Sequence, residues 1–135
     1  MTTLYLAATG PRPSDEVWDR YARPALWSTW APQIRRVDVD TERLGGGETG
    51  RVHGPLGFSA DFEVDTWDEE ARRWSWTVRP RAALLPGVPV PRLHLGHGVL
   101  STEAGTLTWL RLSGPLPLVV PYAPVARLAL HRLVH

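Results

Sequence analysis

The sequence contains no cysteine and no lysine, and each absence narrows the chemistry that the chain can perform. Without cysteine there is no disulfide, no thiolate nucleophile and no sulfur ligand for a metal. All fifteen basic residues are arginines, and their scatter along the chain indicates a compositional bias rather than an anion-binding site. The net charge of +1 argues against nucleic acid as a partner, because its capture requires a basic face.

Long apolar runs are also missing. No stretch approaches the roughly 20 apolar residues that a membrane-spanning helix needs, so we predict no membrane span. The first residues lack a basic region followed by an apolar run, so we expect no secretory signal and a cytoplasmic protein. The 135 residues are expected to form a single domain, residues 1–135, which is large enough to bury one core without disulfides or metals.

What the chain does have is seven tryptophans, in two groups. The first group falls in a short helical opening and the second in a run of predicted strands: Trp18, Trp27 and Trp30, then Trp67, Trp74, Trp76 and Trp109. Large aromatic side chains bury much area but leave gaps when they pack against one another. A small domain with this many is therefore a good candidate for an internal apolar cavity.

Hydrophobic alternation predicts an antiparallel sheet. A first strand at 4–9 is followed by two short helices, the first capped by Ser14, and then by strands near 34–40, 50–54, 58–66, 73–79, 93–101 and 106–113. In three of these strands one face is apolar, and its members are Phe58, Phe62, Trp74, Trp76, Leu95 and His97. The last strand is ambiguous, because Leu107 and Trp109 oppose Leu110 and Leu112 in the pattern.

Two segments are rich in proline. Pro80–Pro91 holds four prolines among apolar side chains and is predicted to be a loop. It either folds onto its own domain, covers a cavity mouth or forms a contact surface. Another four prolines lie between Pro115 and Pro124, so we expect regular helix only from about Tyr122 to Val134.

This order of elements resembles the START-like superfamily, also called SRPBCC or Bet v 1-like, and within it the polyketide cyclase/dehydrase-like proteins of bacteria. The resemblance covers essentially the whole chain. It rests on Glu16-Val17-Trp18, Trp27-Ser28-Thr29-Trp30-Ala31-Pro32, Gly50-Arg51-Val52, Trp74-Ser75-Trp76, His97-Gly98-Val99 with Gly105-Thr106, and Tyr122-Ala123-Pro124 with Leu130 and Leu133. One departure is the proline-rich start of the closing helix, which we expect to shorten or bend its first part.

The resemblance implies an α+β helix-grip fold, in which a curved antiparallel sheet of six to seven strands wraps around the C-terminal helix. It also implies a cavity between the sheet and that helix, where a small hydrophobic molecule such as a polyketide, isoprenoid, quinone or lipid would bind. The residues expected to line this cavity are Trp30, Phe58, Phe62, Trp74, Trp76, Leu95, Trp109, Val125 and Ala129.

His97 is the candidate for chemistry, because it interrupts an apolar strand face. One alternative is a cyclase, aromatase or dehydratase in which His97 transfers protons while Arg111 or Tyr122 polarises a carbonyl. The plainer interpretation is a core histidine whose ring is held by hydrogen bonds. A third alternative is an interaction module that docks through Pro80–Pro91.

No metal or cofactor is expected. His94 and His97 point to opposite faces of their strand, and His131 with His135 lack an evident third ligand. Asp61, Glu63 and Asp65 share the polar face of their strand and are expected to face solvent, and Gly45-Gly46-Gly47 is expected to be a turn. The sequence leaves open the ligand, the reaction and the choice between a monomer and a homodimer.

Overall fold

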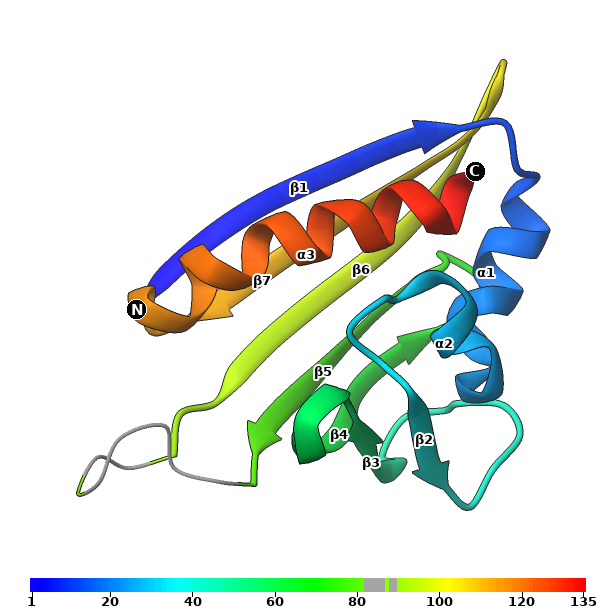
Figure 1. The fold of residues 1–135 in the computed structure, drawn as a ribbon. Coiled ribbons are helices and arrows are strands. Elements are labelled where there is room, and N and C mark those ends of the chain that lie inside the picture. Colours follow the sequence, from blue (N-terminus) through cyan, green and yellow to red (C-terminus); the bar gives the residue numbers. More distant parts are fainter. Residues whose placement is uncertain (82–86, 88–89) are drawn as a thin grey trace.

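Seven antiparallel strands form one curved sheet in the order β1-β7-β6-β5-β4-β3-β2 (Figure 1). The computed structural model describes residues 1–81, 87 and 90–135. The strands are β1 (Thr2–Gly10), β2 (Arg36–Val39), β3 (Thr49–His53), β4 (Ser59–Asp68), β5 (Arg73–Pro80), β6 (Leu93–Thr102) and β7 (Gly105–Gly114). A register shift between Val64 and Thr66 interrupts the pairing of β4 with β5. A bulge of this kind lets a sheet bend.

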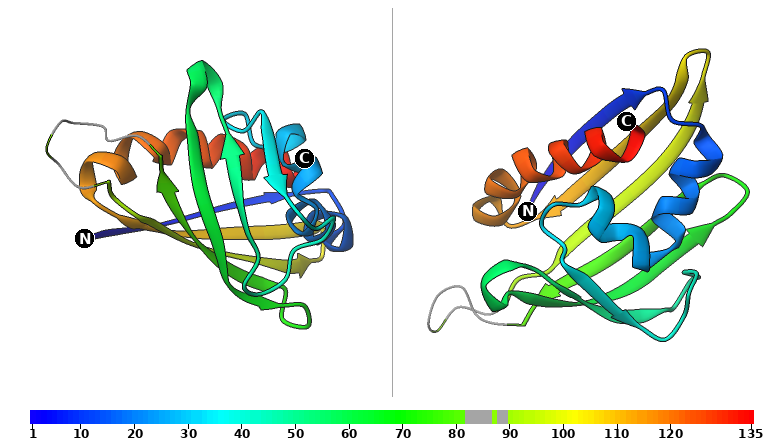
Figure 2. Two further views of the ribbon diagram at one scale, coloured as in Figure 1. Left: turned by 90° about the horizontal axis from the view of Figure 1, so that it is seen from below. Right: turned by 45° about the vertical axis from the view of Figure 1, so that its right-hand side comes forward.

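The helices sit between β1 and β2 and at the C-terminus. They are α1 (Ser14–Ala22), the single turn η1 (Pro24–Leu26), α2 (Trp27–Trp30), the turn η2 (Pro55–Gly57) and α3 (Leu116–Val134). Figures 1 and 2 show α3 lying along the concave side of the sheet, with α1 and α2 closing one end. The predicted helix-grip fold, with two short helices after the first strand, is confirmed.

The start of α3 differs from the prediction, which placed regular helix only from Tyr122. The helix begins at Leu116 and continues through Pro121 and Pro124. Pro117 lies in the first turn, where a backbone N–H has no helical partner and its loss costs little. The two later prolines each remove one helical hydrogen bond, but they do not end the helix. The longer helix therefore covers more of the sheet than expected.

The predicted cap of α1 is also wrong. The N-cap residue is Pro13, whose carbonyl accepts a hydrogen bond from the Val17 amide at 3.1 Å. The Ser14 hydroxyl is instead bonded to the Ser101 hydroxyl at 2.6 Å, so it ties α1 to the end of β6. Asp15 and Glu16 still occupy the first turn, where the helix dipole favours negative charge.

The core lies between the concave face and the helices, and it includes one buried polar chain. The Thr108 hydroxyl donates to the Gly98 carbonyl at 3.0 Å, so the Tyr21 hydroxyl, 2.7 Å away, donates to Thr108. Burial raises the pKa of Tyr21 despite this hydrogen bond. These polar atoms satisfy one another, and they tie α1 to the middle of the sheet.

Most of the predicted Pro80–Pro91 loop, and with it the choice between a lid and a contact surface, lies outside the described residues. In the part of the chain that the structure describes, no helix combines the length and apolar character that crossing a membrane requires.

Candidate ligand-binding cavity

An apolar groove with a volume of about 400 Å³ opens between the sheet and the first half of α3. We call it the outer groove. Its walls come from strands β3 to β6, from the turn at Gly54-Pro55 and from α3, and its apolar lining includes Val52, Phe58, Ala60, Val78, Leu93, Leu118 and Val125. This volume falls within the range of pockets that bind small molecules.

A second and much smaller space, of about 30 Å³, lies deeper along the same face. We call it the inner chamber. Trp30, Trp74, His97 and Ala129 are among the residues that line it. Five residues line both spaces, namely Gln33, Ile34, Trp76, Leu95 and Tyr122. The outer groove and the inner chamber are therefore adjacent, and the Trp76 indole is the largest side chain that borders both.

His97 lies at the inner chamber, in a setting that keeps its ring neutral. The side chain is 6 % exposed and stacks on Trp74, with ring centroids 4.8 Å apart. The Trp76 Nε1–H donates to His97 Nε2 at 3.1 Å. Burial lowers the pKa of His97 to about 3, because the apolar surroundings disfavour the charged imidazolium.

Gln33 and Tyr122 are polar residues that line both spaces. The Gln33 side-chain amide donates to the Tyr122 hydroxyl at 2.9 Å, which joins the segment after α2 to α3. Burial of the phenol raises the pKa of Tyr122, against the effect of this hydrogen bond. Among the described residues, no aspartate, glutamate or arginine lines either space. The described lining therefore carries no carboxylate and no guanidinium group, and the histidine of the outer groove, His53, is bonded to Asp38 at 2.6 Å.

Most of the predicted lining residues do reach the cavity. Trp30, Trp74 and Ala129 line the inner chamber, Phe58 and Val125 line the outer groove, and Trp76 and Leu95 line both. Phe58 is 48 % exposed and so lies at the rim. Phe62 is buried but lines neither space, because its ring packs against Trp27 and Trp76 at 5.8 and 5.5 Å. The predicted candidates His97 and Tyr122 also line the cavity.

Trp109 and Arg111 were expected beside the cavity, and this placement is wrong. Both belong to the convex face of β7, the face opposite the buried Leu110 and Leu112. The reason is the neighbouring strand, where Gly98 pairs with Trp109 and Gly96 with Arg111. A Cβ at Gly98 would collide with the Trp109 indole, and the Arg111 guanidinium lies 3.3 Å from a Cβ built on Gly96. The two large side chains fill the hollow that these glycines leave.

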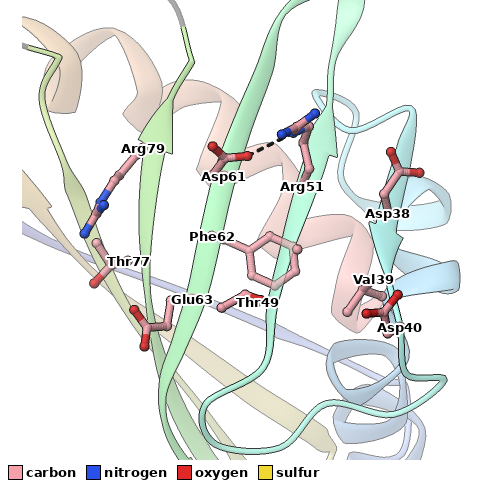
Figure 3. A pocket seen from close by; sticks show the side chains of 11 residues that line it. Asp38, Val39, Asp40, Thr49, Arg51, Asp61, Phe62, Glu63, Thr77 and Arg79 are labelled. Atoms are coloured by element: carbon pink, nitrogen blue, oxygen red, sulfur yellow. Dashed lines mark hydrogen bonds and ion pairs between the residues drawn. The ribbon is translucent and has the colours of Figure 1, made fainter.

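A larger and polar hollow, of about 550 Å³, lies on the convex face of β2 to β5 (Figure 3). Asp61 and Glu63 point into it from β4, as their alternation with buried Phe62 requires. Figure 3 shows the Arg51–Asp61 ion pair, whose atoms are 2.9 Å apart. The expectation that these carboxylates lie on the solvent side is confirmed. Because Asp61 is paired with Arg51 and Arg81 in an open hollow, it forms no isolated acid-base pair with Glu63.

Sequence reasoning missed several lining residues, and those of the segment after α2 and of the start of α3 are the most instructive. Gln33 was not considered, although a polar residue between apolar Ala31 and Ile34 was a usable signal. Pro117, Leu118 and Pro121 were missed because the prolines appeared to exclude a helix there. Within residues 1–81, 87 and 90–135, no group of three or more metal-ligating side chains comes together. Neither His131 nor His135 lines the outer groove or the inner chamber.

Comparison with known families shows which group of proteins shares this architecture. A family model described as "Polyketide cyclase / dehydrase and lipid transport" matches residues 1–134. The chain belongs to this family. The match, together with the Bet v 1-like fold, places it in the SRPBCC superfamily that the sequence resembled and supports ligand binding as its general function. A search of the curated proteins finds no match to this chain.

Solved structures share the fold at low sequence identity. Ara h 8.0201 superposes with a TM-score of 0.76 at 12% identity, covering 98% of this chain and 94% of that one. A hypothetical protein from Helicobacter pylori gives a TM-score of 0.77 at 15% identity, covering 98% and 84%. A protein from Mesorhizobium loti gives 0.76 at 18% identity, covering 98% and 93%. Identities this low establish the fold alone.

Proposed function

We propose that this chain binds a small hydrophobic molecule, of the polyketide, isoprenoid, quinone or lipid type, in the space between the sheet and α3. The observation that supports this most directly is the outer groove of about 400 Å³, with an apolar lining free of aspartate, glutamate and arginine among the described residues. Transfer of an apolar molecule from water into such a groove is favourable in proportion to the apolar area that it buries.

Acid-base catalysis by His97 has less support than binding. A general base needs a free nitrogen and a pKa near the working pH. The Nε2 lone pair of His97 already accepts a hydrogen bond from Trp76, and its pKa of about 3 keeps the ring neutral at pH 7. Arg111, the expected partner in polarising a carbonyl, belongs to the opposite face of the sheet. We therefore assign the cavity to binding without built-in proton transfer.

The proposal is tested by titrating the protein with Nile red, a neutral apolar dye whose emission rises in apolar surroundings. Val125→Arg places a charge in the outer groove, and we expect it to weaken dye binding at least about tenfold, because a buried unpaired charge is costly. Leu128→Arg is the matched control, since Leu128 lies on the same helix but is 45 % exposed. Equal dye binding by the wild type and Val125→Arg would contradict the proposal.

A further inference from the structure

Three buried polar atoms of the inner-chamber residues have no hydrogen-bond partner among the described residues. They are His97 Nδ1, Trp74 Nε1 and Gln33 Oε1. Buried polar atoms are almost always bonded, because an unsatisfied one loses its interaction with water and gains nothing in return. Three such atoms on residues around one small space therefore point to an occupant that would satisfy them.

The hydrogen-bond roles of the three atoms follow from the contacts that their residues already make. Since His97 Nε2 accepts from Trp76, the neutral ring carries its proton on Nδ1, which is then a donor. The Trp74 indole nitrogen can only donate. The Gln33 amide nitrogen donates to Tyr122, which leaves its carbonyl oxygen as an acceptor. The residues that line the inner chamber thus offer two donors and one acceptor.

A hydroxyl group is the complement of this set, because it accepts up to two hydrogen bonds and donates one. The volume of about 30 Å³ also suits a single oxygen atom, since a cavity needs roughly 10–15 Å³ of such volume to hold a water molecule, and a ring would not fit. A carboxylate is disfavoured, because among the described residues no arginine lines the inner chamber to pair with it.

We infer that the ligand is an apolar molecule with one neutral hydroxyl at its end, whose body lies in the outer groove and whose hydroxyl enters the inner chamber. The hydroxyl oxygen accepts from His97 Nδ1 and Trp74 Nε1 and donates to Gln33 Oε1. This inference rests on the proposed function and deepens it, since it selects alcohols and phenols among the hydrophobic molecules that the outer groove could hold.

The test is competition against Nile red by three probes of similar shape, para-butylphenol, butylbenzene and para-butylbenzoate, at pH 7. Without partners in the cavity, the more hydrophobic butylbenzene would bind more tightly than the phenol. We expect the reverse, with the phenol roughly tenfold tighter than butylbenzene and the benzoate weakest. Trp74→Phe removes one donor and keeps an aromatic ring, so it should reduce the preference for the phenol several-fold.

Trp109→Phe is the matched control, because it makes the same replacement on the convex face and should leave the preference unchanged. His97→Phe provides a second variant with the same expected direction as Trp74→Phe, and circular dichroism establishes that each variant is folded. If butylbenzene binds as tightly as the phenol in the wild type, the hydroxyl inference is overturned while the proposed function stands. If neither Nile red nor any of the three probes binds, the proposed function itself fails.

Discussion

The hollow on the convex face and the inner chamber on the concave face differ in how their polar atoms are paired. On the convex face they bond to one another, as in the Arg51–Asp61 ion pair at 2.9 Å and the Thr77–Asp65 hydrogen bond at 2.7 Å. On the concave face the polar atoms of His97 and Trp74 are buried beside a space and lack a complete set of partners. A polar group that is paired within the fold needs no further partner, whereas an unpaired polar atom beside a cavity indicates a ligand.

Tryptophan side chains also have different roles on the two faces of the sheet. Trp76 borders both the outer groove and the inner chamber, while Trp109 covers Gly98 on the outside of the sheet. Both are large residues in central strands, and the sequence pattern alone does not tell them apart. The difference between them can be tested by making equal substitutions on the two faces.

The largest effect is expected from Trp76→Ala. Removing this buried side chain should lower the free energy of unfolding by about 3–5 kcal/mol and should weaken Nile red binding, because the ligand loses the largest aromatic surface that borders both spaces. Trp109→Ala should cost less stability and leave binding intact. Chemical denaturation and dye titration measure the two properties separately. Comparable loss of dye binding in folded Trp109→Ala would remove the distinction between the faces.

A smaller effect on stability is expected when the pH is lowered, and it arises from the protonation of His97. Its pKa is about 3 in the folded protein against an ordinary value of 6.5, so the unfolded chain binds more protons between these values. Stability should therefore fall as the pH drops below 6.5, by about 2 kcal/mol between pH 7 and pH 5. In His97→Gln this part of the pH dependence should disappear. The control His94→Gln, on the convex face, should keep it.

Urea denaturation at the two pH values measures this change for each variant. The comparison is made within one variant, so a constant loss of stability from the substitution does not affect it. An equal fall in stability in wild type and His97→Gln would mean that His97 is not buried as a neutral ring in the folded protein.

The smallest effect is expected for the ion pairs of the convex face. Asp61→Asn removes the partner of Arg51 and Arg81, and half-exposed pairs of this kind contribute about 1 kcal/mol or less. The change in the free energy of unfolding should be within this range and should shrink in concentrated salt. Dye binding should not change. A loss of dye binding in folded Asp61→Asn would show that the convex hollow contributes to the site.

Much of the concave face could be predicted from the sequence. In β6 the alternation of Leu93, Leu95, His97 and Val99 with small or polar residues placed His97 on the buried face, and all four are buried. The same reasoning did not decide β7, because both of its faces carry large side chains. The register of Gly96 and Gly98 against β7 decides it, and pairing register follows from tertiary structure rather than from a single strand.

The start of α3 could not be predicted from proline content. Propensity counts each proline as a helix breaker, but Pro117 falls in the first turn, and Pro121 lies where α3 packs over the outer groove. Tertiary packing compensates for the lost hydrogen bonds. The unpartnered atoms of the inner chamber were equally beyond prediction, since they depend on the Trp76–His97 and Gln33–Tyr122 hydrogen bonds.

The most direct test of the central claim is an NMR titration of the seven tryptophan indole N–H signals with para-butylphenol. Trp→Phe variants assign the signals. We predict that the Trp74 indole signal shifts strongly, because its proton gains an acceptor, and that the Trp109 signal stays in place. A shift at Trp109 without one at Trp74, or no shift in any indole at saturating probe, would contradict a binding site between the concave face and α3.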